Sequence, residues 1–148
     1  MVTVPIVVEK HYKLVLWLLP RMAEFPKDQR FLLADRIERE LLDVLDRLIE
    51  AVYMKDKGPL LQRANLSLEK SRFLMRMAKD MQYVSLKRYD YFSRGVNEIG
   101  RMVGGWQKSQ ISEAAKTRAE RVSGNAPSPV SLAGNQDPGV YGCRERGG

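Results

Sequence analysis

Two sets of basic side chains repeat at helical spacing in the middle of this 148-residue sequence. The spacing is four and three residues in the first set and seven in the second, so on helices each set would form one column along a face. The columns are Arg72, Arg76 and Lys79, and Arg94, Arg101 and Lys108. Such columns can follow a phosphate backbone, because each lysine or arginine that reaches a phosphate releases condensed counter-ions. An ordinary solubilising surface is the alternative interpretation.

The net charge of the chain is concentrated in the same region. Residues 57–108 contain 11 Lys/Arg and 4 Asp/Glu, a net charge of +7, whereas residues 1–56 have a net charge of −1 and residues 109–148 of +1. A charge distribution this uneven attracts polyanions. We therefore predict that the region binds nucleic acid through nine basic side chains, namely Lys70, Arg72, Arg76, Lys79, Lys87, Arg88, Arg94, Arg101 and Lys108.

Four aromatic residues lie among these basic residues: Tyr83, Tyr89, Tyr91 and Phe92. Aromatic rings beside basic side chains can stack on unpaired bases. Aromatic residues at helical spacing also commonly belong to the core, and the sequence leaves both interpretations open.

The residues needed for catalysis or metal binding are scarce. A single histidine, His11, and a single cysteine, Cys143, cannot supply the four ligands of a structural zinc site, and one cysteine cannot form an intrachain disulfide. We interpret His11 as a surface or packing residue. The acidic stretch from Asp35 to Glu50 has basic partners at helical spacing, such as Arg39, and is typical of a solvated helix face. No Gly-rich loop follows a strand. We expect a protein that is not an enzyme and that uses no metal or cofactor.

Four segments have the apolar spacing of amphipathic helices, and they would position the basic columns. The first apolar stripe is Val8, Tyr12, Val15, Leu19 and Met22. The second is Ala34, Ile37, Leu41, Val44, Leu48 and Ala51, widened by Leu42, Leu45 and Ile49. The third is Leu61, Ala64, Leu68, Ser71, Met75 and Ala78, extended by Phe73, Leu74, Met77 and Met81. The fourth is Phe92, Val96, Ile99, Val103 and Trp106.

Proline and glycine mark the boundaries between these segments. Pro20 should kink the end of the first helix, Phe25-Pro26 should end it, and Gly58-Pro59 should separate the second helix from the third. Four long helices joined by short loops predict an all-α, up-down four-helix bundle over residues 1–122. The Gly-, Pro- and Ser-rich residues 123–148 predict a flexible tail. Without a signal peptide or an apolar run of ~20 residues, we expect a cytoplasmic protein that does not enter a membrane.

Three glycines interrupt the fourth predicted helix, where each costs ~1 kcal/mol relative to alanine. They are Gly100, Gly104 and Gly105, and Trp106 beside them is a side chain suited to an interface. Small residues allow another backbone to approach closely. The helix end therefore packs tightly either within the bundle or against a neighbouring subunit, and the sequence leaves both alternatives open.

Taken together and in order, a series of short strings resembles a known family. It begins with Phe25-Pro26, Arg30-Phe31, Asp35-Arg36-Ile37-Glu38, Leu41-Leu42-Asp43 and Leu48-Ile49-Glu50-Ala51. It continues with Ala64-Asn65, Leu68-Glu69, Arg72-Phe73-Leu74, Ala78-Lys79-Asp80 and Glu98-Ile99-Gly100-Arg101-Met102-Val103-Gly104-Gly105-Trp106. Over residues 5–108 the chain resembles the accessory variability determinant of diversity-generating retroelements. That family is part of a wider four-helix-bundle group that includes proteins encoded in ribosomal-RNA intervening sequences.

The resemblance implies properties that spacing alone does not. Family members form a pentameric barrel of bundles, and they bind the reverse transcriptase of the element and its template RNA, or DNA, in support of mutagenic copying. The polymerase supplies the catalysis. By charge and location, the basic columns would then face the RNA or the polymerase. The alternatives are a bundle of the intervening-sequence type and an oligomeric scaffold that binds only protein.

Overall fold

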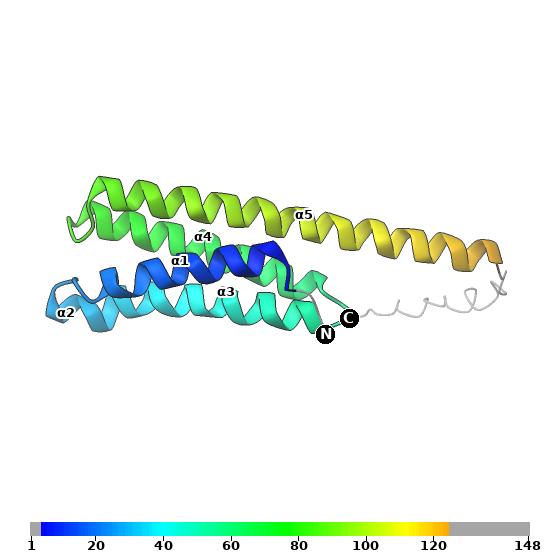
Figure 1. Ribbon diagram of the computed structural model, residues 1–148, viewed down its shortest axis with the longest axis horizontal. Helices are drawn as coiled ribbons and strands as arrows, with labels where there is room; N and C mark the ends of the chain where they lie inside the picture. Colours follow the sequence, from blue (N-terminus) through cyan, green and yellow to red (C-terminus); the bar gives the residue numbers. More distant parts are fainter. Residues whose placement is uncertain (1–3, 125–148) are drawn as a thin grey trace, which may run out of the picture. The chain divides into compact units, whose positions relative to one another are not determined.

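Four long helices form at the apolar stripes, in the part of the chain that the computed structural model describes, residues 4–124. They are α1 (Ile6–Met22), α3 (Asp35–Tyr53), α4 (Gly58–Asp80) and α5 (Leu86–Gly124) (Figure 1). Two short elements lead into α3, namely α2 (Lys27–Gln29) and the single π-helical turn η1 (Arg30–Ala34). Residues 4–124 contain no strand, and the predicted all-α class is confirmed.

Within the first 111 residues the long helices pack side by side as a four-helix bundle. Helix α3 packs against both α1 and α4. Helix α5 lies along α4, where Asn65 Nδ2 donates to Gln107 Oε1 over 3.3 Å, and along α1, where Lys10 Nζ lies 2.7 Å from Glu98 Oε2. Short connections reverse the chain between successive helices, as the up-down topology requires (Figure 1).

The core includes the stripes predicted for the second, third and fourth helices. All six stripe positions of the second helix, and all six of the third, are buried. Ser71 is the one polar member, and its hydroxyl donates to the Leu68 carbonyl over 2.7 Å, which satisfies it inside the core. In α5 the stripe is buried from Phe92 to Val103, and Trp106 packs against the core while partly exposed.

The stripe predicted for the first helix is partly wrong. Tyr12 and Leu19 are 47% and 37% exposed, and His11 and Leu18, each one residue earlier, are buried in their place. The predicted stripe did not include His11, and of the two alternatives stated for this residue, surface or packing, the structure shows packing. His11 is accommodated because its Nε2 lies 2.7 Å from the Leu41 carbonyl oxygen of the adjacent helix α3.

The predicted breaks lie near the helix ends. Helix α1 contains Pro20 and ends at Met22, shortly before Phe25-Pro26, and Phe25 itself is a core residue at 2% exposure. Helix α4 begins at the predicted Gly58-Pro59. It ends in a turn where Gln82, at φ 66°, adopts the left-handed conformation that usually favours glycine.

The chain divides into two units, residues 1–111 and 112–148. The bundle belongs to the first unit, which ends earlier than the predicted residue 122. Helix α5 runs on to Gly124, and its residues 112–123 are all exposed. From residue 125 onward the predicted tail lies outside the described residues. Among residues 4–124 no helix has both the length and the apolar composition needed to cross a membrane.

Candidate nucleic-acid interface

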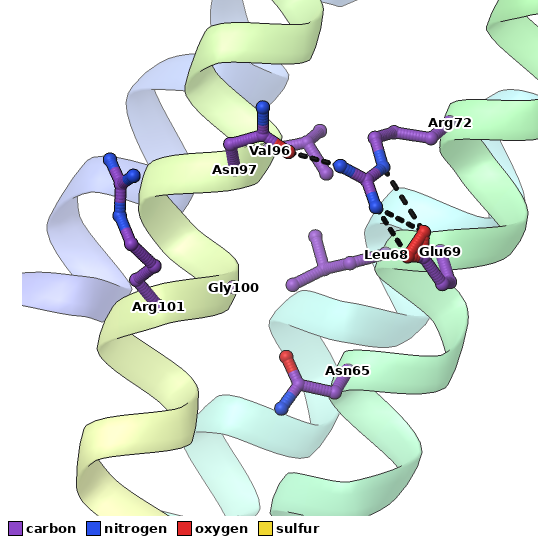
Figure 2. A pocket seen from close by; sticks show the side chains of 8 residues that line it. All are labelled: Asn65, Leu68, Glu69, Arg72, Val96, Asn97, Gly100 and Arg101. Atoms are coloured by element: carbon purple, nitrogen blue, oxygen red, sulfur yellow. Dashed lines mark hydrogen bonds and ion pairs between the residues drawn. The ribbon is translucent and has the colours of Figure 1, made fainter.

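One residue of each predicted basic column lines the groove between α4 and α5. Arg72 of α4 and Arg101 of α5 line one cavity of about 330 Å³ in this groove (Figure 2). Leu68 and Val96, each 2% exposed, also line the cavity. The groove therefore combines an apolar base with basic side chains contributed by both helices.

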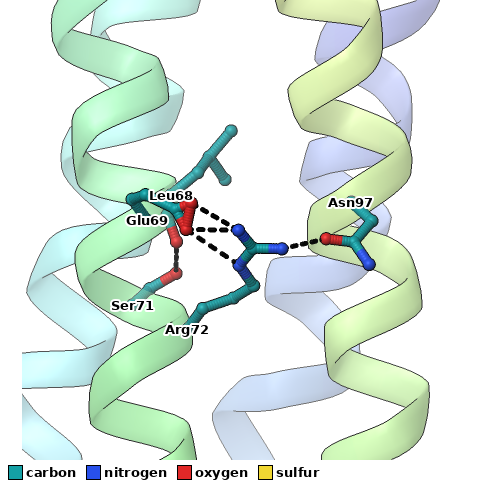
Figure 3. Close-up of polar contacts among 5 residues, drawn as sticks. All are labelled: Leu68, Glu69, Ser71, Arg72 and Asn97. Atoms are coloured by element: carbon teal, nitrogen blue, oxygen red, sulfur yellow. Dashed lines mark hydrogen bonds and ion pairs between the residues drawn. The ribbon is translucent and has the colours of Figure 1, made fainter.

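Arg72 connects the two helices at this groove (Figure 3). Its Nε donates to Glu69 Oε1 over 3.1 Å, its Nη2 contacts both oxygens of the same carboxylate, and its Nη1 donates to Asn97 Oδ1 on α5. The hydrogen bond from Arg72 lowers the pKa of the Glu69 carboxyl, and the same bond raises the pKa of Arg72. Arg72 thus has a structural role in addition to its predicted role on the surface.

A second cavity, of about 310 Å³, shares residues Glu69, Arg72 and Asn97 with the first. Arg76 and Tyr89 also line it. The Lys79 ammonium lies 4.8 Å from the centre of the Tyr89 ring, which fixes this lysine by a cation–π contact. The two cavities extend the groove past both arginines of the first column.

Several predicted basic residues form ion pairs. Every acidic residue of positions 57–108 lies within 4.0 Å of a basic partner, in the pairs Glu69–Arg72, Asp80 with Arg76 and Lys79, Asp90–Arg94 and Glu98–Lys10. Arg88 reaches across to Glu24 over 2.9 Å, at the turn that follows α1. The predicted residues that form no ion pair within residues 4–124 are the exposed Lys70, Lys87, Arg101 and Lys108.

A second groove, between α1 and α5, was not predicted. Its cavity of about 400 Å³ is lined by Lys10 and Lys13 of α1 and by Tyr91 and Arg94 of α5. The two lysines were not predicted as binding residues because residues 1–56 have a net charge of −1 as a whole. That sum combines the basic positions of α1 with the acidic surface of α3.

The four aromatic residues divide between core and surface. Phe92 is fully buried, and Tyr83 and Tyr89 are partly buried against the core. Tyr91 is 54% exposed, and its ring centre lies 4.4 Å from that of Trp17 on α1. Of the four rings, only Tyr91 presents a largely accessible surface beside basic side chains.

The family model described as bAvd-like matches residues 5–110, which is 106 of the 148 residues. The chain belongs to the bAvd-like family. The family is that of the Bordetella accessory variability determinant, so the resemblance drawn from the sequence is confirmed. No curated protein and no solved structure gives a significant match.

The glycines of α5 in this bAvd-like protein have different surroundings. A Cβ atom added at Gly104 or Gly105 would meet no atom within 4 Å, and one at Gly100 would meet only Asn65 Oδ1 at 3.8 Å. Tight packing within the bundle therefore does not account for Gly104 and Gly105, and the subunit alternative remains a prediction. The close approach is instead at Gly95, where a Cβ would lie 3.1 Å from Leu14 Cδ1 of α1.

Proposed function

We propose that this protein is the non-catalytic accessory protein of a diversity-generating retroelement, binding template RNA and the reverse transcriptase through its basic surface. The observation that carries the proposal is that each basic column contributes an arginine, Arg72 or Arg101, to the α4–α5 groove in a chain of the bAvd-like family. Among the described residues, no three His, Cys, Asp or Glu side chains are grouped as a metal site. In this proposal the polymerase performs the chemistry.

Two kinds of basic residue should contribute differently to RNA binding. Arg72 holds Glu69 and Asn97, so reversing its charge would disturb the contact between α4 and α5 as well as any phosphate contact. Arg101 and Lys108 are exposed on α5 and form no ion pair within residues 4–124. They can be changed with less effect on packing, and they provide the cleaner test.

The test compares RNA affinity at low and physiological salt for the wild type and for Arg101→Glu with Lys108→Glu. Each phosphate contact contributes about −0.7 to −0.9 to the slope of log affinity against log salt. The double reversal should weaken binding to many sequences alike and make the slope shallower by about 1.5. The matched control is Lys27→Glu with Lys55→Glu, an equal charge change at exposed residues of the N-terminal half.

Equal affinities of the double variant and the wild type would remove this face from the RNA site. The basic columns would then be assigned to the reverse transcriptase, which pull-down with the purified polymerase would check. A reverse-transcriptase gene beside paired template and variable repeats would support the retroelement function over the intervening-sequence type.

The proposed assembly is a pentamer, and exposed apolar side chains support self-association. Helices α1 and α3 pack together, and both carry such residues, including Leu16 at 51%, Leu42 at 42% and Ile49 at 44% exposure. Phe31, in the turn before α3, is 79% exposed. Apolar surface of this kind is typical of a contact between proteins. Light scattering should give a mass near five times 17.0 kDa, and a monomer at all concentrations would contradict it.

A further inference from the structure

The aromatic residue of the groove between α1 and α5 is Tyr91, which packs against Trp17 of α1. The guanidinium carbon of Arg21 lies 4.6 Å from the centre of the Trp17 ring, and the Trp17 ring centre lies 4.4 Å from that of Tyr91. Arg21 is itself fixed, because its Nη1 donates to the Trp17 carbonyl over 2.6 Å. Tyr91 therefore packs on Trp17 with an angle of 33° between the two rings, and it is 54% exposed. A ring held in this way loses little freedom when another ring stacks on it.

Basic side chains surround this ring. Lys13 lines the same cavity and forms no ion pair within residues 4–124, and Arg94 is the most exposed of the paired arginines, with 80% of its side chain accessible. The pairs that do form, Arg94 with Asp90 over 2.9 Å and Lys10 with Glu98 over 2.7 Å, join exposed groups. Exposed ion pairs contribute little to stability, so a phosphate can replace the carboxylates at small cost.

The base of the groove is apolar and closely packed. Leu14 and Ile99 line it and are 5% and 2% exposed. Gly95 lets α1 approach α5 at this point, since a Cβ would lie 3.1 Å from Leu14 Cδ1. The cavity of about 400 Å³ falls within the size range of small-ligand pockets, ~300–1,000 Å³. The groove therefore offers an apolar base, an aromatic face and cations at its rim.

We propose that this groove binds an unpaired base of single-stranded RNA, stacked on Tyr91, with Lys13 and Arg94 holding the adjacent phosphates. Aromatic faces combined with basic side chains are the means by which proteins hold single strands without reading their sequence. The inference rests on the proposed RNA-binding function, and it adds a second contact region on the other side of α5. An acidic protein segment could satisfy the cations, but it would make no use of a stacked ring.

The experiment measures the affinity of the full chain for a fluorescein-labelled twelve-nucleotide oligoadenylate and for a duplex RNA of the same length. The variants are Tyr91→Leu, which removes the aromatic face, and Tyr91→Phe, which keeps it. Tyr91→Leu should weaken binding to the single strand by about 5- to 150-fold, the loss of one base stack, and leave the duplex unaffected. Tyr91→Phe should stay within about twofold of the wild type. The matched control is Tyr53→Leu, at a tyrosine that is 70% exposed at the end of α3.

Two further measurements keep the proposal falsifiable if Tyr91→Leu folds poorly. Trp17 fluorescence, isolated in a Trp106→Phe background, should change when the oligoadenylate binds, because the base stacks on Tyr91, whose ring centre lies 4.4 Å from that of Trp17. Lys13→Gln should make the salt slope for the single strand shallower by about 0.7, whereas Lys27→Gln should not. An unchanged Trp17 signal at saturation would overturn the proposal.

The outcomes separate this inference from the proposed function. If the wild type binds RNA and Arg101→Glu with Lys108→Glu weakens it, but Tyr91→Leu binds as tightly as the wild type, only the stacking site is wrong. If the wild type binds no RNA, both proposals fail. If a polyglutamate peptide competes for the groove while Tyr91→Leu has no effect, the groove is a protein-binding site and the inference is overturned.

Discussion

His11 is a neutral histidine inside the bundle. It is fully buried, its Nε2 donates to the Leu41 carbonyl over 2.7 Å, and its Nδ1 has no hydrogen-bond partner among the described residues. Burial lowers the pKa of His11 below its ordinary 6.5, and the hydrogen bond to Leu41 opposes this only in part. Protonation would place a charge at a position that supplies one hydrogen-bond acceptor and no carboxylate.

This arrangement predicts a pH dependence of stability. In the unfolded chain His11 takes up a proton near pH 6.5, whereas in the folded chain it does so only at lower pH. The contribution of neutral His11 to the free energy of unfolding is therefore complete above pH 6.5 and is lost as the pH falls through the folded pKa. The free energy of unfolding, measured in urea, should decrease by up to about 1.4 kcal/mol for each unit that the pH falls in this window. His11→Phe should lack this decrease. The same pH dependence in both proteins would assign it to other groups.

Two glycines of α5 should respond in opposite ways to larger side chains. Gly104→Ala meets no atom within 4 Å and gains helix propensity, so it should stabilise the chain by up to about 1 kcal/mol. Gly95→Leu must displace the buried Leu14 and should cost about 1–3 kcal/mol. Thermal unfolding measures both. A melting temperature that Gly95→Leu leaves unchanged would show that α1 can move aside, and a lower oligomer mass for Gly104→Ala would place a second copy at that glycine.

The turn that ends α4 has a residue other than glycine in the left-handed backbone conformation. The backbone N–H of Gln82 donates to the Lys79 carbonyl and that of Tyr83 to the Ala78 carbonyl, each over 2.9 Å, which is the hydrogen-bond pattern of a Schellman motif. Gln82, at φ 66°, occupies the position where glycine is usual.

Replacing this residue should stabilise the turn. A side chain in the left-handed region destabilises the folded chain by ~1–2 kcal/mol, which glycine would relieve. The greater flexibility of glycine in the unfolded chain offsets ~0.5–1 kcal/mol of this stabilisation. Gln82→Gly should therefore raise the free energy of unfolding by about 0.5–1 kcal/mol in urea unfolding, while Gln62→Gly, at an exposed interior position of α4, should lower it. A decrease for Gln82→Gly would mean that the glutamine side chain has a stabilising contact.

Helices with one clear apolar stripe could be predicted from the sequence, and α1 could not be predicted in full. In α3 and α4 every position of the main stripe is buried, but several apolar residues predicted to widen the stripes, such as Leu42, Ile49 and Phe73, are exposed. In α1, apolar residues such as Tyr12, Leu16 and Leu19 lie on the exposed side as well, and the buried His11 is polar. Its burial depends on a carbonyl of α3, which only the packed structure supplies.

The candidate site was predictable to the same extent. The spacing of the basic residues placed each column on one helix, and the structure brings Arg72 and Arg101 to one groove. The α1–α5 groove joins residues about 80 positions apart, such as Lys13 and Arg94. Neither the net charge of a region nor the helical spacing within a segment predicts a contact between residues so far apart in the sequence.

At the scale of the whole molecule, the exposed apolar faces predict where copies meet. Leu42→Gln with Ile49→Gln should leave the helix content of the chain intact, because both residues are exposed in the single chain, but should lower the mass of the assembly in light scattering. Leu66→Gln with Phe73→Gln, an equivalent change on the exposed side of α4, is the matched control. A lower mass for the α4 pair alone would move the subunit contact from α3 to α4.

The ion pairs of α4 and α5 act as internal counter-ions of the basic surface. When a phosphate binds Arg94, the ion pair with Asp90 breaks and Asp90 binds a cation from solution. The net number of ions released is therefore smaller than for an arginine without an ion pair. Arg101 and Lys108 carry no such carboxylate within residues 4–124. The salt dependence of RNA binding will therefore undercount the phosphates that the protein contacts, and the number of contacts has to be established residue by residue.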